Sequence, residues 1–479
     1  MKITLKNLFM KSHNHLYKFL LITLIFAGCR MSKDIIKPVD ATPVAYRGLA
    51  RITDTVSIAS IPVKDFIADP EVKKLIDTAI ARNYDLQLAL KNIEASDLLF
   101  RQSKLGNLPI VNLQIAANSN RPSNNSLNSL TSSQFLSTKH VEDFNANVGL
   151  SWEADIWGKI RNQKEAALAG YLQTVEAKKA VQTRLIANVA QGYYQLLMMD
   201  AQLSIAKKNL ALNDSTLRMI HIQFDAGQVT SLAIQQAEAQ QLVAAQLIPQ
   251  LEQNIAIQEN ALKILIGHLP GSVIRLSSLE STKVPNYLSA GLPSAMVSRR
   301  PDVRSAELSL NIANAKVGIS KANMYPSLSI TASGGLNSFK ASNWFNVPAS
   351  LFGMVAGGIS QPVFQRKELK TQYEIAKIDR ERTVIEFRQS VLNAVGEVSD
   401  ELVKLEKLKV QYDISQKRVI TLQQAVKNAN LLFKNGMASY LEVITAQSNS
   451  LQSELELAAI KTARLSASVE LYRSLGGGI

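Results

Sequence analysis

Hydrophobic residues recur every seven positions along two long stretches of this chain. The first set is Val189, Leu196, Leu203, Leu210, Leu217 and Phe224, and the second is Val391, Val398, Leu405, Tyr412, Val419, Val426 and Phe433. Such a repeat is typical of left-handed coiled-coil packing. Residues 161–224 contain no proline, and a helix over these 64 residues would be about 96 Å long. The pattern predicts long helical hairpins, but it does not distinguish a solid bundle or stalk from a hollow conduit.

Four other segments are predicted to be strands. Three of them alternate apolar and polar residues, and the fourth is rich in glycine and has no clear apolar face. The four segments lie at about 110–118, 145–153, 327–336 and 350–360. One polar and one apolar face suit a membrane β-barrel, although a soluble two-sided sheet would show the same alternation. Trp152, Trp157 and Phe364 fall at strand ends, where an aromatic belt would lie. Because the smallest membrane barrels have about eight strands, several copies of the chain would have to share one barrel.

The chain contains an internal repeat. Residues 80–116 align without gaps to residues 297–333. The identical pairs are Arg82/Arg299, Asp85/Asp302, Ala89/Ala306, Ser103/Ser320, Lys104/Lys321 and Pro109/Pro326. We therefore expect a first repeat over 69–268 with a hairpin at about 160–266, a connecting segment over 269–291, a second repeat over 292–475 with a hairpin at about 366–475, and a tail over 476–479. Each hairpin turns at a Phe-x-x-Gly sequence, near Gly227 and Gly436.

The N-terminal residues predict export. Residues 1–28 combine a basic start with a short apolar core and read as a signal peptide. Small residues precede Cys29, as in a bacterial lipobox, so Cys29 is a candidate for lipidation, palmitate included, at the head of an extended segment over 29–68. An ordinary signal peptide with an incidental cysteine is the alternative.

Composition excludes several classes of protein. The chain has 479 residues, a formal net charge of +14 and one cysteine. One cysteine excludes an internal disulfide framework and a zinc site of several thiolates. The basic charge is spread along an exported chain, which argues against a nucleic-acid partner. We find no nucleophile–base set, no histidine spacing for a metal and no phosphate-binding loop. We therefore expect neither an enzyme nor a cofactor-binding protein.

The sequence resembles the TolC-like outer-membrane efflux factors, in particular their lipoprotein branch of the drug-efflux (RND) type. The resemblance rests on residues 291–307 (GLPSAMVSRRPDVRSAE), 151–159 (SWEADIWGK) and 360–364 (SQPVF), and on the two glycine turns. It implies a mostly α-helical fold with a membrane β-barrel portion. It also implies a homotrimer in which three copies form a twelve-stranded barrel in the outer membrane and a helical barrel that extends into the periplasm.

The resemblance also implies a function. Such ducts dock on a periplasmic adaptor (membrane fusion) protein, which connects them to an inner-membrane RND-type pump, and they export drugs or other toxic small molecules. The alternatives are a duct for protein secretion or metal efflux, or a structural lipoprotein that spans the periplasm without a channel.

Specific residues follow from the resemblance. The candidate adaptor contacts at the periplasmic tips are Phe224, Gly227, Leu232, Phe433, Gly436 and Leu441. Tyr440 and Glu442 are candidate gate residues, and Ala233 takes the place of Glu442 in the first repeat. Three copies would bring three such carboxylates together, although a glutamate that only stabilises a helix start explains Glu442 equally well. Tyr440 could also pack against its own hairpin. Arg299, Arg300 and Asp302 are expected to form structural ion pairs.

Overall fold

The computed structural model describes residues 46, 57–125, 140–284 and 289–478, and these form two units. Unit 1 comprises residues 95–172 and 308–385, and unit 2 comprises residues 57–94, 173–307 and 386–478, with residue 46. The two longest helices, α6 (Lys159–Asp225) and α10 (Glu368–Lys434), have 67 residues each and contribute to both units. The predicted signal peptide and Cys29 lie outside the described residues.

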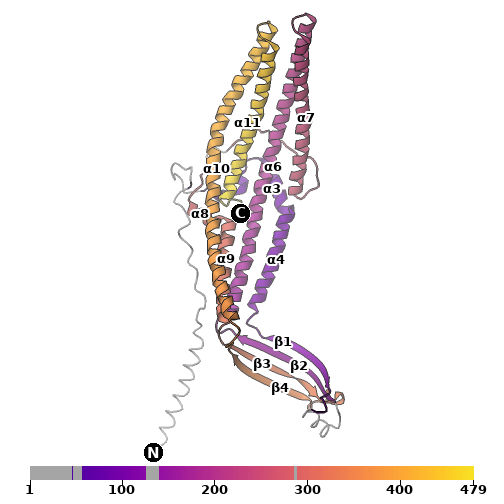
Figure 1. Ribbon diagram of the computed structural model, residues 1–479, viewed down its shortest axis with the longest axis vertical. Helices are drawn as coiled ribbons and strands as arrows, with labels where there is room; N and C mark the ends of the chain where they lie inside the picture. Colours follow the sequence, from indigo (N-terminus) through magenta and orange to yellow (C-terminus); the bar gives the residue numbers. More distant parts are fainter. Residues whose placement is uncertain (1–45, 47–56, 126–139, 285–288, 479) are drawn as a thin grey trace, which may run out of the picture. The chain divides into compact units, whose positions relative to one another are not determined.

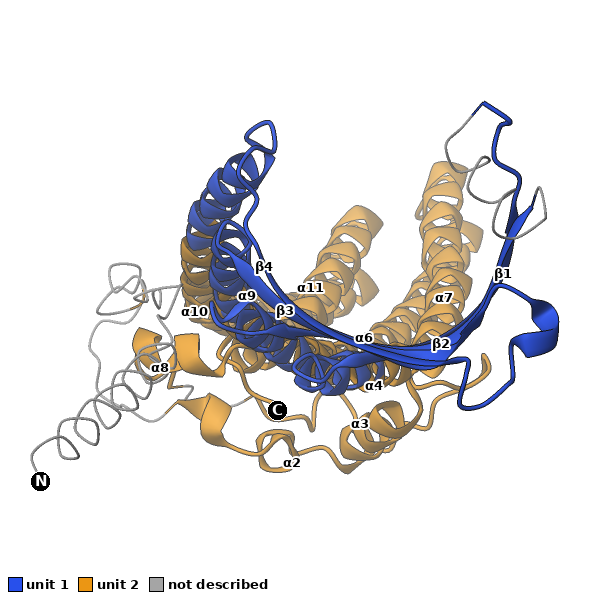
Figure 2. Ribbon diagram, turned by 90° about the horizontal axis from the view of Figure 1, so that it is seen from below, with its two compact units in different colours: residues 1–37, 95–172, 308–385 blue, residues 38–94, 173–307, 386–479 orange. Residues whose placement is uncertain are grey.

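Unit 1 contains one antiparallel sheet of four strands in the order β1-β2-β3-β4. The strands are β1 (Ile110–Asn120), β2 (Val141–Ala154), β3 (Ser327–Ser338) and β4 (Leu351–Ser360), and each overlaps a segment that the sequence predicts to be a strand. Figure 2 shows them as one curved sheet. Gly335 lets β2 and β3 approach closely, because a Cβ atom there would lie 2.1 Å from the carbonyl oxygen of Ala146.

Each strand pair of unit 1 is continuous with helices. α4 (Tyr84–Lys104) precedes β1, and α9 (Pro301–Ala322) precedes β3, while α6 and α10 follow β2 and β4. The short 3₁₀ turn η3 (Ala341–Asn343) lies between β3 and β4. At the start of α6, the Asp155 carboxylate accepts hydrogen bonds from the backbone N–H groups of Ile160 and Arg161, at 2.9 Å each. These two donors would otherwise have no partner within the helix.

Unit 2 is built from helices. Short elements η2 (Ile58–Ser60), α2 (Val63–Phe66) and α8 (Pro293–Arg299) accompany α3 (Pro70–Arg82) and two hairpins. The first hairpin pairs α6 with α7 (Ser231–Leu265), and the second pairs α10 with α11 (Tyr440–Ser474). Pro249 lies inside α7 without ending it.

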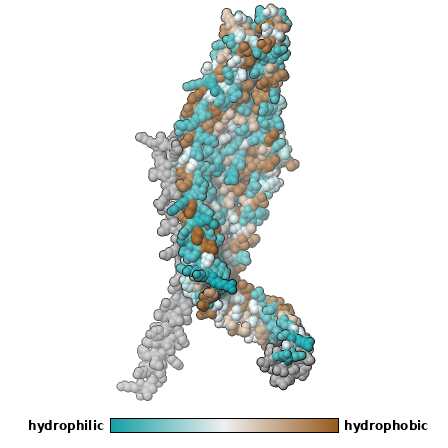
Figure 3. All heavy atoms as spheres, in the orientation of Figure 1, coloured by the Kyte–Doolittle hydropathy of each residue, from teal (hydrophilic) through white to brown (hydrophobic). Residues whose placement is uncertain are grey.

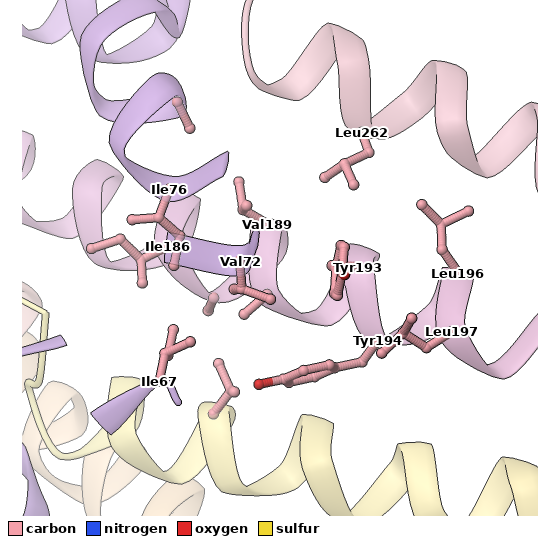
Figure 4. Packing of buried hydrophobic residues seen from close by; sticks show 14 of the residues in the cluster. Ile67, Val72, Ile76, Ile186, Val189, Tyr193, Tyr194, Leu196, Leu197 and Leu262 are labelled. Atoms are coloured by element: carbon pink, nitrogen blue, oxygen red, sulfur yellow. The ribbon is translucent and has the colours of Figure 1, made fainter. Parts of the chain in front are cut away.

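The main hydrophobic core of unit 2 lies where α3, α6, α7 and α11 meet (Figure 4). Val72 and Ile76 of α3 face Val189 and Tyr193 of α6, and all four are buried. Burial raises the pKa of the neighbouring Tyr194 to about 12, so this hydroxyl stays neutral at physiological pH. The residues of the α6 heptad that enter this core pack as the seven-residue spacing predicts.

Farther along α6 the buried seam becomes polar. Asn209, Asn213 and Thr216 are buried there, and the Asn213 amide donates to the Asn209 carbonyl and side-chain oxygens at 2.9 Å. Leu210 and Leu217 of the heptad are only partly buried. The seam is therefore apolar in its first turns and partly polar in the later ones, where polar side chains that satisfy one another take buried positions and Leu217 packs at the edge of a second apolar cluster.

A buried ion-pair network joins the end of α8 to α10 and α11. Arg300, 6 % exposed, holds both oxygens of Asp302 at 3.0 and 2.7 Å and reaches Glu397 at 2.7 Å. Glu397 also pairs with Arg473, which contacts Glu470. Burial alone would raise the pKa of Asp302, but the hydrogen bonds and charge of Arg300 outweigh it, so the net pKa is lowered. The network gives the predicted pairing of Arg300 and Asp302 a structural role.

Replacing Arg300 should destabilise unit 2. Arg300→Met would leave Asp302 and Glu397 without their cation, and we expect a loss of about 3 kcal/mol, at the lower end for a broken buried pair because both carboxylates keep some solvent. Because the pKa of Asp302 is lowered, its contribution is present above the ordinary carboxyl pKa and disappears as pH falls through the lowered value. Denaturant unfolding at several pH values would measure both effects.

Arg304→Met is the matched control, because the Arg304–Glu307 pair lies within one helix and Arg304 is 40 % exposed. We expect it to change the free energy of unfolding by less than about 1 kcal/mol. Equal losses for the two variants would contradict a special role for the network.

Candidate functional site at the hairpin tips

Two glycine turns end the long helices in unit 2. Gly227 and Gly436 have φ of +72° and +71°, a conformation that side chains disfavour. After α6, the N–H of Gln228 donates to the Gln223 carbonyl at 2.8 Å. After α10, the N–H of Met437 donates to the Leu432 carbonyl at 2.9 Å. These bonds satisfy carbonyl groups at both helix ends, as in a Schellman motif.

An apolar cluster lies just inside the tips and joins all four helices. This tip cluster consists of Ile220 from α6, Ala233 and Ala237 from α7, Phe433 from α10 and Val443 from α11. Phe433 is only 2 % exposed and is its largest side chain. The cluster therefore holds the two hairpins of one chain together by burying apolar surface.

Hydrogen bonds also cross between the hairpins. The Tyr440 hydroxyl at the start of α11 donates to Oε1 of Gln236 on α7 at 2.6 Å. Deeper in the unit, the buried Gln447 amide donates to the Thr216 hydroxyl at 2.9 Å. Tyr440 thus contacts the other hairpin of its own chain.

Glu442 stabilises the first turn of α11. Its carboxylate accepts a hydrogen bond from the backbone N–H of Ser439 at 2.7 Å, which forms a capping box with the Ser439 side chain. Glu442 remains exposed, whereas its counterpart Ala233 is buried in the tip cluster. The carboxylate therefore has a local structural partner and also faces solvent.

The predicted adaptor-contact residues differ in accessibility. Phe224, Leu232 and Leu441 are 41, 54 and 50 % exposed, while the Phe433 side chain is buried in the tip cluster. Phe433 would therefore support the tip from inside. Met437, 76 % exposed next to Gly436, is a tip residue that the sequence analysis missed, although an apolar residue beside a turn glycine is a readable signal.

The three predicted belt aromatics lie in unit 1 at the strand–helix junctions. The indole N–H of Trp152 donates to the Asn107 carbonyl at 2.8 Å, and that of Trp157 donates to the Pro326 carbonyl at 2.7 Å. Phe364 is 85 % exposed. Satisfied indole N–H groups beside an exposed aromatic ring fit a membrane–water interface.

In residues 46, 57–125, 140–284 and 289–478, no group of three or more His, Cys, Asp or Glu side chains is placed to hold a metal ion. No helix among the described residues is both long and apolar enough to cross a membrane.

Comparison with known proteins identifies the family. The family model for outer membrane efflux proteins matches residues 75–268 and 292–477. The solvent efflux pump outer membrane protein SrpC of Pseudomonas putida is 31 % identical over 95 % of this chain and 96 % of its own length. The cation efflux system protein CusC of Escherichia coli K12 is 29 % identical over 95 % and 98 %.

A solved structure shows the same fold. The open state of the MtrE outer membrane channel of Neisseria gonorrhoeae matches with a TM-score of 0.82 and 25 % identity, over 94 % of this chain and 98 % of that one. The predicted resemblance to TolC-like channels is confirmed, and so are the outer-membrane location and the expectation that the chain is no enzyme. This chain belongs to the outer membrane efflux protein family.

Proposed function

We propose that three copies of this chain form a passive duct that carries small molecules out through the outer membrane. The unpaired edges of the sheet are the observation that supports this most strongly. Among the described strands, β1 and β4 are each hydrogen-bonded to a neighbour on one side only. Open edges are not tolerated in lipid, because each unpaired backbone group costs several kcal/mol there.

The outer surface of the strands suits lipid. Leu113 and Ile115 of β1 and Val355 and Ile359 of β4 are all at least two-thirds exposed. An apolar patch of this kind is unfavourable in water and favourable in a bilayer. Two copies would supply eight strands and three would supply twelve, and the likeness to TolC-like channels favours three.

The hairpin tips are the proposed gate. Because the tip cluster and the Tyr440–Gln236 hydrogen bond tie the two hairpins of one chain together, opening has two possible routes. Either the hairpins separate and the cluster is exposed, or both hairpins of a chain move together away from the neighbouring chains. Contact with a periplasmic adaptor at Phe224, Leu232 and Leu441 would shift this two-state equilibrium. An inner-membrane RND-type pump would supply the cargo and the energy.

Drugs and other toxic small molecules are the proposed cargo. The relatives are named for cations and for solvents, so the family alone does not select the cargo. The sequence has no Met-rich or His-rich tract of the kind that handles soft metals. Metal efflux is therefore less favoured, and protein secretion stays the alternative. Cys29 is proposed to carry the lipid anchor.

Single-channel conductance tests the duct and its gate. We expect the purified full chain to run as a detergent-resistant trimer and to give small, steady currents in planar bilayers. Tyr440→Phe removes only the hydrogen bond to Gln236 and should raise the open probability several-fold. Glu442→Ala should reduce the preference for cations. Tyr412→Phe is the matched control, since among the described residues the Tyr412 hydroxyl has no hydrogen-bond partner.

A structural stalk predicts that the protein in detergent is a monomeric or dimeric rod without conductance. That result would refute the duct. If conductance is normal but neither tip variant changes open probability or ion preference, the two hairpins of one chain do not separate on opening and Glu442 does not set the ion preference.

The stiffness of the tip can be tested through its glycine. Gly436→Ala places a Cβ in a left-handed residue with no atom within 4 Å, so its cost is conformational strain of roughly 1–2 kcal/mol. Hydrogen exchange of peptides covering 430–445 should become faster. Gly396→Ala is the control, because Gly396 lies within α10 with equally open space and should gain roughly 0.5–1 kcal/mol. Slower exchange at the tip in Gly436→Ala would contradict the assigned turn.

A further inference from the structure

Unit 1 carries a group of exposed cations where β2 and β4 continue into helices. We name as the basic rim Arg161 and Lys164 near the start of α6 and Arg366, Lys367 and Lys370 around the start of α10. All five are exposed, and Figure 3 shows hydrophilic residues gathered where the helices meet the strands. Within the described residues, none of the five side chains forms an ion pair.

Four acidic side chains lie close in sequence to these cations. Glu153 pairs with Lys159 at 3.1 Å, and Asp155 accepts two backbone hydrogen bonds at the start of α6. Glu368 accepts a hydrogen bond from Gln372 at 3.1 Å. Glu165 is exposed on α6 and is the acidic side chain nearest in sequence to Lys164. Glu153 is neutralised by Lys159, and the five rim cations outnumber the remaining Asp155, Glu165 and Glu368, so the rim keeps a net positive charge.

These cations occupy an electrostatically unfavourable place. The N-terminal end of a helix carries a partial positive charge, so cations there are disfavoured. The Asp155 carboxylate offsets part of this charge at α6, and Glu368 lies in the first turn of α10, but within the described residues neither forms an ion pair with a rim cation. An anion from outside the chain would offset both the helix ends and the side chains.

Backbone conformation singles out Arg366 and Lys367. They have φ of +50° and +64°, and among the described residues they are the non-glycine residues with positive φ. At the matching junction before α6, the left-handed residue is Gly158, with φ of +73°. At the first junction a glycine adopts the left-handed conformation without strain. At the second junction two long cationic side chains adopt it instead. Such an outlier points to a use for the side chains themselves.

Apolar groups adjoin the cations. Val363 and Phe364 are 93 and 85 % exposed and directly precede Gln365 and Arg366. A pocket of about 270 Å³ at the same junction is lined by residues that include Trp157, Tyr325, Pro362 and Gln365, with Lys159 among them. The rings of Trp157 and Tyr325 are in contact, with centroids 4.8 Å apart. Exposed apolar side chains beside unpaired cations match the boundary between acyl chains and headgroups.

We propose that the basic rim binds the phosphate groups of anionic phospholipids in the membrane leaflet that meets the strand–helix junctions. Val363 and Phe364 enter the acyl region, and Arg366 and Lys367 contact the headgroups. Charge complementarity and the adjoining apolar surface select a lipid rather than a soluble anion. The proposal rests on the strands lying in the membrane, as in the proposed function.

Lipid retention tests the proposal directly. The full-length protein is equilibrated in detergent micelles with phosphatidylglycerol and phosphatidylethanolamine, washed, and analysed for bound headgroups. We expect phosphatidylglycerol to be enriched several-fold over the micelle ratio, and the enrichment to decline as salt rises from 50 to 500 mM, in line with screening. Arg366→Gly combined with Lys367→Gly should abolish most of it. A cation near an anionic surface contributes up to about fivefold in binding, so the loss of two is enough to remove a several-fold enrichment.

The glycine pair also removes the left-handed strain, so the variant is expected to fold at least as well as the parent. Lys409→Gln with Lys417→Gln is the matched control, because both lysines are exposed on α10 in unit 2 and form no ion pair within the described residues. We expect this control to retain phosphatidylglycerol like the parent.

Three results would overturn the proposal: equal enrichment of the two lipids, unchanged enrichment in the glycine pair, or displacement of the lipid by inorganic phosphate at the same concentration. The last would mean a site for a free anion. Conductance is recorded on the same samples. Normal conductance without lipid enrichment would refute lipid binding by the basic rim and leave the proposed duct standing. Lipid enrichment without conductance would refute the duct and leave lipid binding by the basic rim standing.

Discussion

The backbone N–H and C=O groups along the outer edges of β1 and β4 have no partner among the described strands, yet this is an outer-membrane protein. A bilayer offers these groups no water, so they require another strand. In the proposed trimer, every chain gives one edge to each neighbour. Association of the chains then follows from the hydrogen bonding of strand edges in the membrane. The apolar faces of the strands favour the membrane location but do not require a second chain. The helices of unit 2 must accommodate the symmetry that the sheet imposes.

Different interactions hold the helices of unit 2 together in different regions. The core around Tyr193 is apolar, the network around Arg300 is ionic, and the tips combine the apolar tip cluster with the Tyr440–Gln236 hydrogen bond. An ionic layer fixes the relative position of helices, since each charge needs its partner in place. A small apolar cluster closed by one exposed hydrogen bond is easier to rearrange. The gradient from base to tip suits a rigid support that carries a movable end.

Much of this arrangement was predictable from sequence. Alternation located β1, β2 and β3 because one face of each is apolar, whereas the glycine-rich β4 shows no clear face in its sequence. The two Phe-x-x-Gly sequences located the turns because glycine tolerates positive φ. The polar seam at Asn209 and Asn213 was not predictable from heptads, which count only apolar residues. The partner of Tyr440 lies 204 residues away, so no local pattern indicates it. The left-handed backbone conformation of Arg366 and Lys367 was not predictable, because the conformational preferences of amino acids assign such positions to glycine.

The ties between the hairpins at both ends of unit 2 have a consequence for how the chain can vary. Gln191 of α6 bonds to Glu470 of α11 at 3.0 Å, and far along the same two helices Ile220 and Val443 meet in the tip cluster. Inserting one helical turn into only one of the two helices, between the Gln191–Glu470 bond and the tip cluster, would make it impossible for both contacts to stay aligned. Natural variants and designed chimeras of this chain should therefore lengthen or shorten both repeats by the same number of residues, and a change in one alone should be tolerated only outside that interval.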